Sequence, residues 1–269
     1  YRKANYLVGN EEGAAVLEMT LYGGSCRFEE DTVIALTGAD MQPTVNQKPI
    51  AMNQAVKVPA GGVLNLGMAK TGCRTYLAVA GGFEVPKVMG SYSTNLKCGI
   101  GGHEGRALQM GDELPIGEAL HSWDEVKDRK VSVPDYPKEV LVSVVPGPQE
   151  EYFTEAGIYH FYSESYEVTE SCDRMGYRLE GPEVESKNGT DIVSDGIVFG
   201  SIQIPSSGKP IILMADHQTT GGYAKIGTVT QADLPKVAQC KPGDRIRFRK
   251  VSVEEAQEIS RKERKKECF

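Results

Sequence analysis

The sequence lacks the closely spaced cysteines and histidines of a metal site. Its six cysteines include no CxxC pair, and none has a histidine nearby in the chain; they are Cys26, Cys73, Cys98, Cys172, Cys240 and Cys268. Zinc sites need ligands at short, regular spacings. We therefore expect no metal centre. We also expect free thiols in a reducing compartment, which predicts a cytoplasmic protein.

Long hydrophobic runs and an excess of basic residues are missing too. No stretch approaches the roughly 18 apolar residues that a membrane helix needs. Lys and Arg number 30 against 37 Asp and Glu, the formal net charge is -7, and there is one Trp. These numbers argue against a membrane-spanning protein. They also argue against a nucleic-acid partner, because such proteins use basic patches and aromatic stacking.

Several catalytic and nucleotide-binding signatures are absent as well. The sequence has no HExxH motif, no EF-hand loop and no GxGxxG between a strand and a helix. It shows no Ser-His-Asp arrangement of a serine hydrolase. Gly221-Gly222 are not followed by the GK[ST] of a phosphate-binding loop. The sequence therefore assigns no ATP site to this chain.

Short β-type runs dominate what is present, and they predict a mainly β protein with few short helices. These runs are rich in Val, Ile and Leu and are bounded by Gly, Pro, Asn and Asp. They cover residues 32–38, 55–59, 75–81, 139–147, 196–205, 209–215 and 244–251. Helical patterns cover residues 1–8, closed by Gly9-Asn10, then 154–164, 233–239 and a tail opened by the capping pair Ser252 and Glu255.

A polar, proline-containing segment at 122–138 separates two β-rich halves. We predict a first β domain at 1–130, a second at 131–251 and a charged helical tail at 252–269. In both halves a buried strand ends in Ala-Asp and a Pro-Gly turn and an alternating strand follow, which predicts an internal duplication. Asp40 and Asp216 would then be equivalent, and a cleft between two such domains would suit a ligand.

ADHQTTGGYAKIG, residues 215–227, is the densest group of polar side chains. One interpretation is a hairpin in which Gly221-Gly222 supply positive φ. That does not explain why five polar residues precede the glycines; they are Asp216, His217, Gln218, Thr219 and Thr220. Donors and acceptors at the end of a buried strand suit a small amide or carboxylate ligand. Both interpretations remain open at this point.

Two further segments contain candidate ligand-binding groups. In CDRMGYRLEG (172–181), Arg174 or Arg178 could hold a carboxylate or phosphate, or form an ordinary salt bridge with Asp173. The glycine-rich segment 78–108 carries the polar loop that contains Ser91 and Thr94. Its backbone amides could bind an anion, or the glycines could serve only to bend a structured loop.

Three long motifs resemble a known family. They are RTYLAVAGGFEVPKVMGSYST (74–94), SCDRMGYRLEG (171–181) and ADHQTTGGYAKIGTVTQADLPKVAQCKPGD (215–244). Over nearly its whole length the chain resembles the allophanate hydrolase subunit 2 family. That family includes the C subunit of 5-oxoprolinase and KipA, and is similar to a module of the carboxyltransferase domain of urea carboxylase. The resemblance implies two cyclophilin-like β-barrel domains and a glycine-rich segment before Tyr1.

The resemblance also implies a function. It points to a component of an ATP-dependent 5-oxoprolinase, a hydrolase that opens 5-oxo-L-proline to L-glutamate. The implied partners are an allophanate hydrolase subunit 1 type protein (the B-type component of 5-oxoprolinase) and a LamB/YcsF-type protein (the A-type component), without which the chain would be inactive. One alternative is a biotin-dependent carboxyltransferase component that receives carboxybiotin from another protein. Another is a KipA-like regulator that binds a histidine-kinase inhibitor.

Within that family the candidate residues would have distinct roles. Gln218, Thr219 and Thr220, with the backbone amides of Gly221 and Gly222, would line the site of a developing oxyanion. Asp216 or His217 would move a proton. Arg174 or Arg178 would hold the substrate carboxylate or a phosphate. The expected substrate-binding set is completed by Tyr223, Ser91, Thr94 and Asp40.

Overall fold

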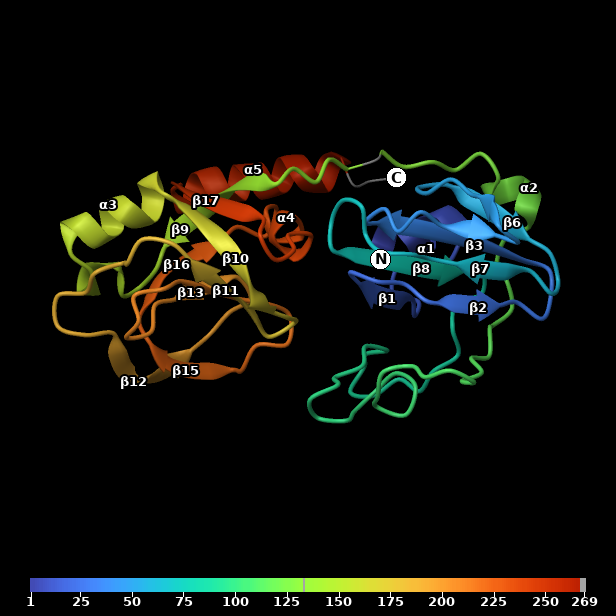
Figure 1. Ribbon diagram of the computed structural model, residues 1–269, viewed down its shortest axis with the longest axis horizontal. Helices are drawn as coiled ribbons and strands as arrows, with labels where there is room; N and C mark the ends of the chain where they lie inside the picture. The colour runs from blue at the N-terminus through green and yellow to red at the C-terminus, as the bar shows by residue number, and fades with distance from the viewer. Residues whose placement is uncertain (133, 267–269) are drawn as a thin grey trace. The chain divides into compact units, whose positions relative to one another are not determined.

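The computed structural model describes residues 1–132 and 134–266 (Figure 1). The chain forms two compact units, Tyr1–Asp135 and Tyr136–Phe269, called here the first and second unit. Both consist mainly of β-strands with a few short helices, which confirms the predicted fold class.

The first unit contains two four-stranded antiparallel sheets, with strand orders β1-β8-β3-β6 and β2-β7-β4-β5. Its elements are α1 (Arg2–Val8), β1 (Leu17–Thr20), β2 (Ser25–Arg27), β3 (Thr32–Gly38), β4 (Thr44–Val45), β5 (Lys48–Pro49), β6 (Ala55–Val58), β7 (Val63–Asn65), β8 (Arg74–Val79) and α2 (Trp123–Val126). The described strands thus form two sheets here rather than one closed barrel. Strands of two or three residues make up the second sheet, too short for a ladder that closes on the first.

β3 runs through the first sheet and is buried on both faces. Val33 and Ala35 belong to the cluster under α1, whereas Ile34 and Leu36 belong to a different cluster. Successive residues of a strand point to opposite faces, so a strand covered on both sides is a continuous apolar run. This explains the sequence VIAL and confirms the strand predicted at 32–38.

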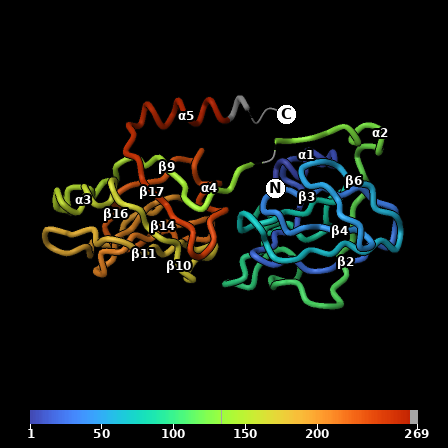
Figure 2. The backbone as a smooth tube through the Cα atoms, turned by 45° about the horizontal axis from the view of Figure 1, so that its top comes forward, coloured from blue at the N-terminus to red at the C-terminus, as the bar shows by residue number. Residues whose placement is uncertain are grey.

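α1 packs on this sheet beside β3 (Figure 2). The helix ends at Gly9, whose φ of 78° is left-handed and whose N–H donates to the carbonyl of Tyr6. Nδ2 of Asn10 then donates to the carbonyl of Val79 in β8, at 2.8 Å. The helix predicted for residues 1–8, with its end at Gly9-Asn10, is confirmed, and Gly9 supplies the left-handed cap.

The second unit is built around a closed barrel with strand order β10-β11-β14-β13-β16-β9-β17, and β12 pairs with β15 outside it. Its elements are β9 (Glu139–Pro146), η1 (Glu150–Tyr152), α3 (Glu155–Ser163), β10 (Ser165–Cys172), β11 (Gly176–Glu180), β12 (Asp191–Gly196), β13 (Ser201–Gln203), β14 (Ile211–Leu213), β15 (Thr220–Tyr223), β16 (Lys225–Val229), α4 (Leu234–Ala238), β17 (Arg245–Lys250) and α5 (Val253–Lys266). β9 and β17 pair in parallel, which closes the barrel.

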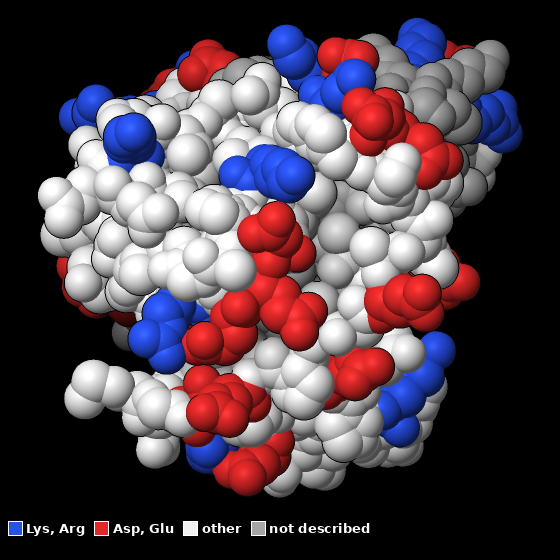
Figure 3. Space-filling view, turned by 90° about the vertical axis from the view of Figure 1, so that its right-hand side faces the viewer, with Lys and Arg blue, Asp and Glu red and all other residues white. Residues whose placement is uncertain are grey.

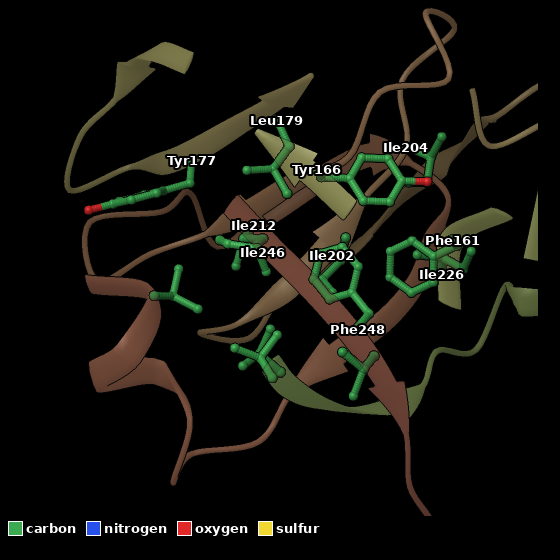
Figure 4. Close-up of a cluster of buried hydrophobic side chains, with 14 of the residues drawn as sticks. Phe161, Tyr166, Tyr177, Leu179, Ile202, Ile204, Ile212, Ile226, Ile246 and Phe248 are labelled. Carbon is green, nitrogen blue, oxygen red and sulfur yellow. The ribbon is translucent and has the colours of Figure 1, made fainter. Parts of the chain in front are cut away.

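The barrel interior follows from the alternation that the sequence shows. In β17, Ile246 and Phe248 are buried, while Arg245 and Arg247 are exposed. The ring of Phe248 stacks on that of Phe161 from α3, with centroids 4.4 Å apart. Figure 4 shows these aromatic and aliphatic side chains gathered in one cluster. The barrel interior is therefore a packed core, formed by the inward-pointing residues of the strands together with a side chain of α3.

The helices predicted for the second half are also found. Thr154 caps α3 by accepting a hydrogen bond from the N–H of Gly157, at 3.0 Å. At the start of α5 the Ser252 hydroxyl accepts a hydrogen bond from the N–H of Glu255, at 3.1 Å. α4 corresponds to the pattern at 233–239. The predicted tail continues to residue 269, and Cys268 lies outside the described residues.

Two local features differ from the sequence prediction. Residues 196–205 do not form one strand, because Gly200 turns the chain with a φ of 90° between β12 and β13. A short helix, α2, lies within the polar segment at 122–138, where no helix was expected. Its first turn is closed by Ser122 and Glu125, a second capping pair of the kind that marks the start of the tail helix.

Candidate functional site

The chain that follows β14 does not form a hairpin. β14 and β16 are not neighbours, because β13 lies between them in the barrel. Residues 215–219 instead lead into β15, which pairs with β12 outside the barrel. The predicted hairpin is therefore wrong. A strand pairing with residues about 30 positions earlier has no short-range signal in the sequence.

Gly221 and Gly222 lie within β15, and the prediction that they supply positive φ is also wrong. Gly221 is needed for space instead. A Cβ there would lie 2.6 Å from Nε2 of Gln203 and 2.6 Å from Cδ1 of Ile197. Gln203 is 2% exposed and so has little room to move. A larger residue at this position would have to displace the ends of these two buried side chains.

Arg174 and Asp216 form a two-pronged ion pair between the turn before β11 and the turn after β14. Nε of Arg174 donates to Oδ2 of Asp216 at 3.0 Å, and Nη2 donates to Oδ1 at 3.2 Å. The backbone N–H of Asp216 donates to the carbonyl of Arg174, at 2.7 Å. Asp173 accepts hydrogen bonds from the N–H groups of Met175 and Gly176. The turn before β11 and the turn after β14 are thus joined by side chains and backbone.

His217 is half-buried next to this pair, and the polar residues after it are exposed. Nδ1 of His217 lies 2.7 Å from the carbonyl oxygen of Gln218. A carbonyl can only accept, so Nδ1 carries the hydrogen and the other ring nitrogen, Nε2, is left to accept a proton in the neutral ring. Gln218, Thr219 and Thr220 are exposed. The structure therefore brings Arg174, Asp216 and the segment 217–220 together in one region.

Arg178 and Tyr223 lie further from this pair along their strands. Arg178 is exposed on β11, opposite Ile211 of β14. Arg174 instead lies in the bend between β10 and β11, four residues before Arg178 in the chain. Tyr223 ends β15 and is 40% exposed. Arg174 is thus the arginine of the predicted pair that meets Asp216.

The remaining predicted residues belong to the first unit. Asp40 follows β3 and accepts a hydrogen bond from the N–H of Gln42, at 2.8 Å. Ser91 exchanges backbone hydrogen bonds with Val88, and its hydroxyl accepts one from the N–H of Ser93. Thr94 is half-buried beside Gly102, in the long segment between β8 and α2. Their substrate-binding role stays a prediction.

Lys225 is a residue that the sequence reasoning missed. It begins β16, its side chain is 5% exposed, and its Nζ lies 2.8 Å from Oδ2 of Asp195 in β12. That contact lowers the pKa of Asp195, with a further contribution from the N–H of Gly196. A lysine inside the run AKIGTV, otherwise free of charge, was the available signal, because lysine is rarely buried without a partner.

The described residues show neither a metal-binding cluster nor a membrane-spanning helix. Within residues 1–132 and 134–266, no three His, Cys, Asp or Glu side chains gather to hold a metal. No helix in that part of the chain is long and apolar enough to cross a membrane. A hollow of about 520 Å³ lies between β16 and α5, where none of the predicted site residues lines it.

The surface charge agrees with the composition. On the face drawn in Figure 3, acidic side chains form a band and basic side chains are scattered. The formal net charge is -7. That face offers no continuous basic surface of the kind that binds a phosphate backbone.

Comparison with known proteins relates the chain to components of multi-protein and multi-domain enzymes. It is 38% identical to the C subunit of 5-oxoprolinase from Haemophilus influenzae over 97% of this chain and 83% of that protein. The corresponding Escherichia coli protein is 40% identical over 95% of this chain and 81% of that protein. The crystal structure of Kluyveromyces lactis urea carboxylase superposes with a TM-score of 0.87 at 30% identity, covering 98% of this chain and 25% of that one.

These relatives confirm the resemblance that the three long motifs indicated. The similarity extends over both units, so it concerns the whole described fold and not one motif. A family model described as carboxyltransferase domain, subdomain A and B, matches residues 1–250. The chain belongs to this family of carboxyltransferase domains.

Proposed function

We propose that this protein is a component of an ATP-dependent 5-oxoprolinase complex, which hydrolyses the cyclic amide of 5-oxo-L-proline to give L-glutamate. The observation that carries the proposal is the 38% and 40% identity to two proteins named as the C subunit of 5-oxoprolinase, over nearly the whole chain. The lettered name of those relatives supports a complex. The proposed partners are a B-type protein and a LamB/YcsF-type protein, the A-type component.

The proposed chemistry explains why several hydrogen-bond donors are needed. A lactam carbonyl is a poor electrophile because the nitrogen shares its lone pair with it. Transfer of a phosphoryl group from ATP to the carbonyl oxygen would make attack by water feasible. Water adds to the carbonyl carbon and loses a proton, so the new oxygen carries negative charge in the tetrahedral adduct, and donors already aimed at it lower the barrier. The C–N bond then breaks as the ring nitrogen takes a proton, and a second water releases the phosphoryl group as inorganic phosphate. No residue of this chain is assigned to ATP.

In this proposal the exposed polar segment supplies those donors. The hydroxyls of Thr219 and Thr220 and the side-chain amide of Gln218 face solvent and so are open to a ligand. His217 transfers the proton through Nε2, because its Nδ1 is engaged with the carbonyl of Gln218. Asp216 is held by Arg174 and keeps the turn in place.

A second function is favoured by the family itself. The matching family model describes a carboxyltransferase domain, and the superposing crystal structure is of a urea carboxylase. Under this alternative the same donors polarise a urea-type carbonyl, and carboxybiotin is supplied by another protein. Urea and 5-oxoproline share the N–C=O group, so one site chemistry suits either substrate.

Reconstitution decides between these functions. The chain is mixed with its B-type and A-type partners, ATP and 5-oxo-L-proline, and glutamate is measured. Glutamate formation that requires all three proteins is the expected result. Carboxylation of urea with a carboxybiotin donor, without glutamate, would replace the proposal with the second function. Tight binding to the B-type partner alone, with neither product, would favour a regulator.

A further inference from the structure

Lys225 lies beneath the ribbon formed by β12 and β15, residues 191–196 and 220–223. Its side chain is 5% exposed, and its Nζ donates to Oδ2 of Asp195 at 2.8 Å. Asp195 is on the ribbon and its side chain is 54% exposed. The buried cation is therefore joined to a half-exposed anion, and the ion pair connects the barrel strand β16 to the ribbon.

Asp195 is held in place by more than Lys225. Its Oδ1 accepts a hydrogen bond from the N–H of Gly196, at 2.7 Å. Gln149 joins the same group, because its Oε1 accepts from the N–H of Lys225 at 3.2 Å and its side chain contributes to the lowered pKa of Asp195. The carboxylate thus receives hydrogen bonds from both the ribbon and the barrel.

The ribbon connects this ion pair directly to the candidate site. Asp195 lies opposite Gly221 in the ladder, and Gly196 lies opposite Thr220. The next residue along, Ile197, donates its N–H to the carbonyl of Thr219, at 3.0 Å. The proposed oxyanion donors on the ribbon therefore lie within a few ladder steps of the residue that Lys225 holds.

Packing gives the ribbon a second attachment. Gly221 approaches Gln203 and Ile197 so closely that a Cβ would not fit. The ribbon is otherwise exposed: the β12 side chains are mostly exposed, and Val193 is 93% exposed. A two-stranded ribbon has little stability of its own in water. Ile192 of β12 also packs against the barrel core. The position of the ribbon on the barrel therefore depends on a small number of contacts among the described residues, of which the Lys225–Asp195 ion pair is the charged one.

We infer that Lys225 and Asp195 are positioning residues that fix the ribbon, and with it Thr219, Thr220 and the amides of Gly221 and Gly222, over the barrel. The part that concerns substrate rests on the proposed function. If Lys225 contacts Asp195 and not the substrate, then replacing either residue should loosen the ribbon to the same extent.

Hydrogen exchange tests this without any assay of activity. We expect K225M and D195N each to raise the exchange rate of amides in residues 191–196 and 220–223 by roughly tenfold or more, since a charge-assisted hydrogen bond is lost. The double variant K225M/D195N should exchange no faster than the more affected single variant, because one interaction is removed. Amides of β9 and β17 should be unchanged.

The matched control is K209M, which breaks the Lys209–Glu180 ion pair of 2.9 Å elsewhere in the same unit. It should leave the ribbon as protected as in the unmodified chain. Unchanged ribbon exchange in both K225M and D195N would overturn the inference, whatever the activity. Additive loosening in the double variant would overturn it too, because the two residues would then act separately.

Kinetics of the reconstituted complex separate positioning from direct substrate contact. For positioning, K225M and D195N should lower kcat/KM by a similar factor, roughly tenfold, and K209M should not. A large loss in K225M with normal activity in D195N would show that Lys225 contacts substrate and would overturn the inference. If the complex makes no glutamate at all, the proposed function fails while the exchange result still stands.

Discussion

Nε and Nη2 of Arg174 donate to the two carboxylate oxygens of Asp216, at 3.0 and 3.2 Å. An arginine keeps its charge across the accessible pH range, so the carboxylate has a permanent cationic partner. A base must give up its partner to take a proton. The two-pronged pair therefore suits Asp216 to hold the turn, and it is the reason why the proposed function gives the proton transfer to His217.

Breaking this pair should destabilise the second unit modestly. Asp216→Asn removes the charge, and the side chains of Arg174 and Asp216 are 34% and 22% exposed. Solvent screens a pair of that exposure, so we expect a loss of about 1 kcal/mol in the free energy of unfolding. Urea unfolding followed by circular dichroism measures it. Glu170→Gln, at an exposed position of β10, is the control and should change nothing.

Replacement of His217 should impair turnover without affecting the fold. In His217→Asn the amide can still donate to the carbonyl of Gln218 but cannot carry a proton. We expect kcat of the reconstituted complex to fall by about 100-fold, the usual contribution of a general acid–base group. His160→Asn, on the exposed side of α3, should retain full activity. Full turnover in His217→Asn would assign the proton transfer to another residue.

Adjacent glycines of β15 should respond differently to the same substitution. Gly221→Ala places a Cβ 2.6 Å from Gln203 and Ile197, which forces a shift. We expect a loss of about 1–3 kcal/mol in ribbon stability, measured by hydrogen exchange. Gly222→Ala meets its nearest atom, the carbonyl oxygen of Ile192, at 3.5 Å and should be tolerated. Equal effects at both glycines would contradict the close packing.

Removal of one barrel aromatic should be much more costly. Phe248 is 2% exposed and stacks on Phe161 at 4.4 Å between centroids. Phe248→Ala leaves a cavity in the core, for which about 3–5 kcal/mol is typical. Calorimetry should show a lower melting temperature for the second unit. The substitution Phe248→Leu fills most of the space and should cost clearly less.

The long segment between β8 and α2 should lose order in acid. Arg106 donates to both carboxylate oxygens of Asp112, at 2.7 and 2.9 Å, and lowers the pKa of Asp112 well below its usual range. A lowered pKa stabilises the folded state above the ordinary range of aspartate, near about 4, and this contribution is lost as the pH falls below it.

Pepsin, which is active in acid, measures this loss. Cleavage within residues 83–116 should be slow at about pH 4 and faster at about pH 2.5. In Asp112→Asn the group no longer titrates, so cleavage should be fast at both pH values. Cleavage of the unmodified chain that does not change with pH would show that the Arg106–Asp112 pair contributes nothing to the order of this segment.

The sequence predicted those helices and strands whose own residues carry a recognisable pattern. β17 was visible because its buried and exposed residues alternate, and α1 was visible because Gly9 marks its end. The β12–β15 ribbon was not visible, because its strands are exposed and lie far apart in the chain. Gly221 was misread as a turn residue, since glycine serves tight packing and positive φ equally well and the sequence does not separate the two uses.

The sequence by itself determined the fold class, the family and the polar segment at 216–220. Hydrophobic periodicity and the order of motifs are properties of residues that are close together in the chain, so both can be recognised in the sequence alone. Only the tertiary structure decided that Asp216 belongs to Arg174, 42 residues away, and Lys225 to Asp195, 30 residues away. Such pairs form because the pairing of β11 with β14 and the packing of the ribbon on the barrel bring distant segments together, and an isolated charged residue in a sequence does not reveal its partner.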